Sequence, residues 1–244
     1  MRIGVISDVH GNRFALQAVL KELLTASPDL VINLGDQAYG AADPRGAIEL
    51  QHSLGALEVR GNNDERLSPN YAPPFDDSRR FLFTAWVRAT IGLAAARRLG
   101  SLPLTMSALN GELLAFHASP TNTWQAVIES WEGGRLVRTA TEEELLAATS
   151  GFGYPSLIVT GHTHRERLLR FQTFTVVNVG AVGWQHDGDP RARWTLLTRI
   201  GKDWAVRFHR IEYDIPAAAE FVARCSPDPL PETRMLRTGV LDRG

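Results

Sequence analysis

Cysteine and long apolar runs are scarce in this sequence. Its 244 residues include one cysteine, Cys225, so an intrachain disulfide and a thiolate metal cluster are both excluded. Any metal site must therefore be built from oxygen and imidazole ligands. No apolar stretch is long enough to span a bilayer, and the first predicted strand begins at residue 2, which leaves no room for a cleavable signal. We therefore expect a cytoplasmic protein without a membrane anchor.

The sequence also has no excess of charge of either sign. Its formal net charge is -1, with 22% charged and 44% hydrophobic residues, as is usual for soluble globular proteins. This balance argues against a basic surface for nucleic acid or an acidic membrane. No repeat or low-complexity block divides the chain. We expect residues 1–244 to form a single α/β domain with insertions.

The organising stretch lies at the start of the chain. Residues 3–6 are continuously apolar, which is typical of a strand buried on both faces of a parallel sheet. Asp8 and His10 follow this strand directly, where open α/β sheets place their chemistry, and two residues apart they can converge on one metal ion. Alone, this pattern is weak, and a capped strand-to-helix turn explains it equally well.

The same pattern recurs along the chain. Amphipathic helices are predicted from Asn12 and from Asp43, and strands at 30–34 and 56–59 complete a parallel βαβαβ unit. A hairpin is expected around Asn110–Gly111, between strands 104–108 and 112–116. A further buried strand covers 157–160. Three later segments predict an antiparallel meander that a fourth joins: 166–171, 174–179, 193–200 and 204–211.

Two segments, at about 65–102 and 119–153, interrupt this succession of predicted strands and helices. The first should contain one helix from Ser78 to Leu99, and the second a helix at 124–131 and another capped by Thr141. We expect both to be cap-like insertions that select the substrate. A last helix is predicted at 216–224, followed by a proline-rich tail from about 226 that could lie along the surface.

Seven polar residues fall directly after predicted strands: Asp8, His10, Asp36, Asn62, His117, His162 and His164. Two carboxylates, four imidazoles and one amide oxygen, without sulfur, suit Mn²⁺, Fe²⁺/Fe³⁺ or Zn²⁺ better than Ca²⁺ or Cu⁺. They are too many for one tetrahedral ion. Two divalent ions that share one bridging carboxylate would use all seven and attract phosphate.

In this order, the blocks Asp8-x-His10, Gly35-Asp36, Gly61-Asn62, His117 and Gly161-His162-x-His164 resemble the calcineurin-like metallophosphoesterase superfamily. The match covers roughly residues 1–200. The stretches 7–12, 178–183 and 187–192 are similar to the small bacterial and archaeal phosphodiesterases and diadenosine tetraphosphatase-like proteins. The resemblance implies a four-layer α/β sandwich of two packed mixed β-sheets flanked by helices.

The resemblance also implies roles for residues. Asp8, His10 and His164 would bind one ion, and Asp36 would bridge to a second ion held by Asn62, His117 and His162. A metal-bridging hydroxide would then attack a small phosphodiester or nucleotide in line. Asp36, Asn62 and His117 are thereby the predicted catalytic residues, and the loop 178–183 is expected to pass close to the ions.

One position departs from the family pattern. Many members have histidine directly after the metal-binding asparagine, where it can protonate the leaving oxygen, but this chain has Asn63. An amide cannot act as a general acid near neutral pH, so strong monoesterase activity is not expected. Asn63, Arg13 and Arg60 are the predicted substrate contacts, although arginines beside strand ends equally often make structural contacts.

Three other functions remain open from the sequence. A phosphoprotein phosphatase shares the opening Asp-x-His-Gly-Asn block but would be expected to retain a histidine at position 63, and a dinucleoside polyphosphate hydrolase is a further enzymatic alternative. A protein-binding scaffold on the same fold, like the retromer subunit of the superfamily, is the alternative of another class. Scaffolds tend to lose ligands, whereas this chain keeps all seven. The sequence does not indicate an oligomeric state.

Overall fold

The computed structural model describes residues 1–72, 78–132 and 135–240; residues 73–77 and 133–134 of the two predicted insertions and residues 241–244 lie outside this part. One five-stranded sheet has the order β12-β11-β1-β2-β3. Its strands are β1 (Arg2–Ile6), β2 (Leu30–Asn33), β3 (Leu57–Glu58), β11 (Ala192–Ile200) and β12 (Asp203–Ile211). β1, β2 and β3 are parallel, as predicted, whereas β11 runs antiparallel to β1 and to β12.

A second five-stranded sheet has the order β4-β5-β8-β10-β9. Its strands are β4 (Thr105–Ala108), β5 (Leu113–Phe116), β8 (Leu157–Thr160), β9 (Glu166–Arg170) and β10 (Thr175–Val179). β5, β8 and β10 are parallel, and β4 and β9 pair antiparallel at the two edges. The predicted hairpin at Asn110 is present, with a short 3₁₀ turn, η1 (Leu109–Gly111), between β4 and β5.

The predicted single meander is wrong. β9 and β10 pair with each other in the second sheet, whereas β11 and β12 pair with each other in the first sheet. Each segment does form a strand, but the chain changes sheets between Val179 and Ala192. Local alternation of apolar residues identifies a strand and carries no information about its neighbour.

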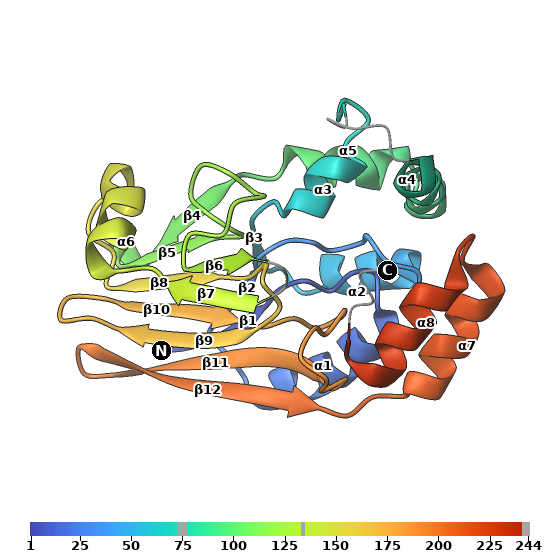
Figure 1. Ribbon diagram of the computed structural model, residues 1–244. Coiled ribbons are helices and arrows are strands. Elements are labelled where there is room, and N and C mark those ends of the chain that lie inside the picture. Colours follow the sequence, from blue (N-terminus) through green and yellow to red (C-terminus); the bar gives the residue numbers. More distant parts are fainter. Residues whose placement is uncertain (73–77, 133–134, 241–244) are drawn as a thin grey trace.

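The two sheets pack face to face in four layers (Figure 1). The central core combines β1 and β2 of one sheet with β5, β8 and β10 of the other, through residues such as Val5 and Val159. On the outer face of the first sheet, α1 (Arg13–Thr25) packs Leu16, Val19 and Leu23 against β11. The outer face of the second sheet is covered by part of the 119–153 segment, including α6 (Glu142–Thr149). The predicted α/β sandwich is thereby confirmed.

Helix caps follow the sequence closely. The side chain of Asn12 accepts from the backbone N–H of Ala15 at the start of α1, and Asp43 accepts from Gly46 at the start of α2 (Pro44–His52). Thr141 forms the predicted capping box of α6, which continues into the 3₁₀ turn η2 (Ser150–Phe152). The short α3 (Asn62–Leu67) begins directly at one of the predicted ligands.

Three other predictions are wrong. The helix expected over 78–99 is two helices, α4 (Ser78–Ile91) and α5 (Leu93–Ser101), because Gly92 between them has φ +85°, outside the helical region. The helix expected over 124–131 is absent from the described residues; the hairpin of β6 (Glu129–Glu132) and β7 (Arg135–Thr139) occupies its end. The tail does not merely lie along the surface.

The tail instead forms a helix that is anchored in the interior. After α7 (Ile215–Cys225), the chain forms α8 (Pro229–Thr238), which buries Glu232, Met235 and Leu236. Leu236 packs with residues of α7 and of the loop before α2. The end of the chain therefore contributes to the surroundings of the strand ends. None of the helices in the described residues is both long and apolar enough to cross a membrane.

Candidate metal centre

The seven predicted ligands meet where the carboxyl ends of the two sheets come together. Asp8 and His10 follow β1, and Asp36 and Asn62 follow β2 and β3. From the second sheet, His117 follows β5, and His162 and His164 follow β8. All seven side chains are buried except that of His162, which is half-buried. Residues up to 156 positions apart in the sequence thus share one interior site.

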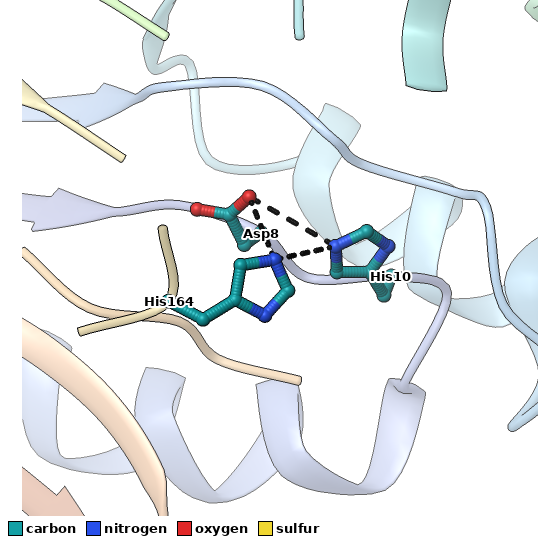
Figure 2. A group of neighbouring side chains, drawn as sticks. All are labelled: Asp8, His10 and His164. Carbon is teal, nitrogen blue, oxygen red and sulfur yellow. Dashed lines mark hydrogen bonds and ion pairs between the residues drawn. The ribbon is translucent and has the colours of Figure 1, made fainter. Parts of the chain in front are cut away.

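The first group consists of Asp8, His10 and His164 (Figure 2). The Nε2 atom of His164 lies 3.3 Å from Asp8 Oδ1 and 3.1 Å from His10 Nε2. Asp8 Oδ1 is buried and accepts no hydrogen bond from the residues that the structure describes. Asp8 also forms a compact group with Asp36 and His117. One carboxylate oxygen therefore faces imidazoles on both sides of the site.

The second group adjoins the first through Asp36. Its Oδ2 lies 3.6 Å from His10 Nε2, and its Oδ1 lies 3.7 Å from His117 Nε2. Beyond Asp36, the Nε2 atom of His117 lies 3.0 Å from Asn62 Oδ1 and 3.3 Å from His162 Nδ1. The two oxygens of Asp36 thus point toward different histidines, an arrangement compatible with a bridging carboxylate.

Backbone carbonyls determine which imidazole nitrogens face the centre. A carbonyl can only accept, so a ring whose Nδ1 lies beside one carries its proton there and presents a lone pair on Nε2. The acceptors are the carbonyl of Tyr39 for His10 at 2.8 Å, that of Leu34 for His117 at 2.8 Å, and that of Trp184 for His164. Backbone acceptors of this kind commonly orient histidines that bind metals.

The resulting arrangement is repulsive without a cation. The Nε2 lone pairs of His10 and His164 face each other at 3.1 Å, beside the unpaired Asp8 Oδ1. A proton on His164 would relieve one contact, whereas a divalent cation would be bound by both imidazoles and the carboxylate at once. The donor set therefore fits a divalent cation, and the nitrogen and oxygen mixture suits Mn²⁺, iron or Zn²⁺.

The pKa shifts of the histidines and aspartates also bear on cation binding. Burial lowers the pKa of His10 to about 4 and that of His162 to about 4, with neighbouring imidazoles adding to the effect. Burial acts to lower the pKa of His164 as well, but the Asp8 carboxylate raises it above its ordinary value. Burial opposes ionisation of Asp8 and Asp36, yet the histidines beside them lower both pKa values. Ionised carboxylates and neutral imidazoles are the states in which these groups bind metals, so Asp8, Asp36, His10 and His162 are ready to bind, whereas a cation would displace the proton that Asp8 favours on His164.

The backbone at the site is unusual. Five of the seven predicted ligands have left-handed backbone angles: Asp8 at φ 53°, His10 at 48°, Asp36 at 55°, His162 at 70° and His164 at 60°. Such residues cost on the order of 1–3 kcal/mol each and gather at functional sites. Close approach also requires glycine, because a Cβ on Gly61 would lie 2.2 Å from Asp36 Oδ1. The chain thus accepts local strain to bring these side chains together.

The predicted substrate contacts are placed differently. Arg13 pairs with the Asp43 carboxylate, and Arg60 donates to the carbonyl of Gly100 at 2.6 Å. Asn63 lies inside the centre, where its Nδ2 donates to Asp36 Oδ2 at 2.5 Å and its backbone N–H donates to Oδ1 at 2.7 Å. The structure therefore brings Asn63, but neither arginine guanidinium, into contact with a predicted ligand.

Aromatic residues beside the ligands were missed by the sequence reasoning. The rings of Trp184 and His10 stack with centroids 4.1 Å apart, and those of His186 and His164 also stack at 4.1 Å. Their loop lies against the first ligand segment, because Gly183 N donates to the Asp8 carbonyl at 2.9 Å. The glycine-rich stretch 178–183 predicted this proximity, but no spacing signal marked the two rings that follow it.

Comparison with known proteins identifies the family of the chain. The model of the calcineurin-like phosphoesterase superfamily domain matches residues 1–199. An uncharacterized protein of Methanocaldococcus jannaschii is 28% identical over 239 residues, covering 91% of this chain and 92% of that protein. The crystal structure of a metallophosphoesterase from Sphaerobacter thermophilus aligns with a TM-score of 0.77 at 27% identity, over 98% of this chain and 100% of that one.

A hypothetical protein from Pyrococcus horikoshii shares the fold, with a TM-score of 0.75 at 16% identity over 99% of both chains. The family match includes all seven strand-end residues, from Asp8 to His164. Five of them, Asp8, His10, Asp36, His117 and His164, form the two groups that could hold a metal ion. The chain belongs to the calcineurin-like phosphoesterase superfamily.

Proposed function

We propose that this protein is a phosphoesterase that depends on two divalent cations and hydrolyses small phosphodiesters or nucleotide esters. The observation that carries the proposal is the pair of adjoining ligand groups that Asp8 and Asp36 connect. Two bound cations would neutralise phosphate charge and acidify a water molecule for in-line attack. The first would be held by Asp8, His10 and His164, and the second by Asn62, His117 and His162, with Asp36 between them.

Hydrogen bonds within the protein would keep the Asp36 carboxylate in one orientation. Asn63 donates to both oxygens of Asp36. Asp64 accepts from the backbone N–H groups of Asp36, Gln37 and Gly61 at 2.8, 2.9 and 3.0 Å, which ties the β2 loop to the start of α3. Preorganised ligands of this kind lose little freedom when cations bind.

Asn63 also bears on the class of ester. It occupies the position where a general acid would stand in many relatives, and its amide donates to a ligand. Esters whose leaving group needs no protonation are therefore favoured over alkyl monoesters. This reasoning favours a phosphodiesterase over a phosphoprotein phosphatase. The complete set of seven ligands likewise favours an enzyme over a scaffold.

Metal analysis followed by a substrate screen tests the proposal. Protein purified without chelator should contain about two ions per chain, and it should hydrolyse bis(4-nitrophenyl) phosphate after addition of Mn²⁺ or Zn²⁺. Asp8→Asn should remove both properties, whereas Asp203→Asn, an exposed carboxylate at the start of β12, should change neither. One ion or fewer together with no hydrolysis by the saturated protein would contradict the proposal.

A further inference from the structure

In the part of the chain that the structure describes, Arg66 stands near the candidate metal centre without an acidic partner. Arg66 lies one helical turn after Asn62 on α3, so both side chains project from the same face of that helix. Arg66 is half-buried. Among the residues that the structure describes, no carboxylate pairs with its guanidinium and no acceptor receives its side-chain N–H groups. The neighbouring Glu65 is engaged by the hydroxyl of Thr123, which donates to its Oε2 at 2.5 Å.

Aromatic rings hold this guanidinium in place. Its Cζ lies 5.0 Å from the ring centroid of Tyr39 and 4.9 Å from that of Trp124. Both distances are within the range of cation–π attraction. These contacts use none of the N–H donors of the guanidinium in hydrogen bonds to a protein acceptor. Arg66 is therefore positioned with donors available for an anion.

The same rings connect Arg66 to the ligands. The carbonyl of Tyr39 accepts from His10 Nδ1. The side chain of Tyr39 lies edge-on to Trp184, with centroids 6.0 Å apart, and Trp184 stacks on His10. On the opposite side, Trp124 is 39% exposed and thus faces solvent. Arg66 therefore stands between the metal centre and the surface, at the α3 side of the site.

Two other arginines near this region donate hydrogen bonds to backbone carbonyls. Arg88 donates to the carbonyls of Leu67 and Arg66 at 3.0 and 2.8 Å, and Arg60 donates to that of Gly100. These three contacts hold α3 against α4 and α5. Arg66 contributes none of them from its side chain, so its charge is not required to close this packing.

We propose that Arg66 binds a second phosphate of the substrate, on the leaving-group side of the phosphorus that is attacked. The inference rests on the proposed function and narrows its substrate class to compounds in which a second phosphate is joined to the one that is attacked. Arginine suits this task because its planar fork donates two parallel hydrogen bonds to phosphate oxygens.

Hydrolysis of such a substrate needs no general acid, which is consistent with asparagine at position 63. Water releases a proton to the solvent, its oxygen forms a bond to one phosphorus, and the bond from that phosphorus to the bridging oxygen breaks. The bridging oxygen keeps the electron pair and leaves as part of a phosphate, which is stable without a proton near neutral pH. Proton donation at position 63 is then unnecessary, and Arg66 would stabilise the charge that develops on the departing group.

Steady-state kinetics of the metal-loaded full chain test this inference. The probes are diadenosine tetraphosphate, which has a phosphate chain, and bis(4-nitrophenyl) phosphate, which has one phosphate. Arg66→Gln should raise KM for the tetraphosphate about 10- to 100-fold, as expected for loss of hydrogen bonds to a charged group, and change kcat/KM for the single-phosphate diester by less than about twofold. Arg66→Lys should recover part of the loss because it keeps the charge but not the fork.

The control is Arg97→Gln, which removes an exposed arginine from the neighbouring α5 and should affect neither probe. Metal content and melting temperature are measured for each variant. Equal losses on both probes, no loss on the tetraphosphate, or a wild type that cleaves only the diester would each overturn the role of Arg66. Failure of the wild type on both probes would overturn the proposed function itself, and this inference with it.

Discussion

Glu232 offers a test of how the C-terminal helix supports the site. Its carboxylate is 5% exposed and accepts from the backbone N–H of Ala41 at 2.8 and 3.0 Å. Ala41 lies two residues after Tyr39, whose carbonyl orients His10. Burial raises the pKa of Glu232 from its ordinary value of 4.5 to about 7. The helix thus places a carboxyl group that favours its neutral form against the backbone of Ala41, two residues from the carbonyl that orients His10.

This raised pKa has a defined consequence for stability. Below pH 4.5 the carboxyl is protonated in the folded and the unfolded chain alike. Between pH 4.5 and about 7 only the folded chain keeps the proton, so the stabilisation is lost as the pH rises, and it is fully lost above about 7. Since one pKa unit corresponds to 1.36 kcal/mol, the largest loss from this group is about 3 kcal/mol.

Glu232→Gln removes the titration and keeps an oxygen that can accept from Ala41. In urea unfolding at pH 5 and pH 8, with equal metal content, the stability of the variant relative to wild type should increase by up to about 3 kcal/mol at the higher pH. Glu143→Gln, an exposed glutamate on α6, is the control and should show no such increase. The same difference between variant and wild type at both pH values would refute the reasoning.

Further predictions concern the centre and its surroundings. Asp36→Asn should lower the occupancy of both ions, because each oxygen of this carboxylate faces a different histidine; elemental analysis that finds two ions would contradict it. Wild type should hydrolyse bis(4-nitrophenyl) phosphate far faster than glycerol phosphate, and Asn63→His should narrow this gap, since a general acid is worth about 10²- to 10⁴-fold. Equal rates in the wild type would show that another residue supplies the proton. Replacing residues 120–128 by a flexible linker should alter substrate preference at constant metal content, and an unchanged profile in a folded variant would count against a selective role.

Patterns among neighbouring residues were sufficient to predict many of the strands and helix caps of this molecule. Apolar runs that end in Asp8 and His10, or in Gly35-Asp36, identified both the strands and the polar residues at their carboxyl ends, because a buried strand tolerates no unpaired charge along its length. The caps at Asn12 and Thr141 formed as expected. These features depend on neighbours a few positions away, which a sequence displays directly.

Contacts between distant residues were decided only by the tertiary structure. Alternation could not assign β11 to the first sheet, because a strand's partner is selected by the packed faces of both sheets. Arg66, Tyr39 and Trp124 lie up to 85 positions apart, and no spacing relates them. The buried carboxylate of Glu232 likewise lies in a proline-rich tail that showed no apolar pattern of its own. Side chains from separate elements acquire a shared environment only when those elements pack, so the sequence could propose the ligand set but not its surroundings.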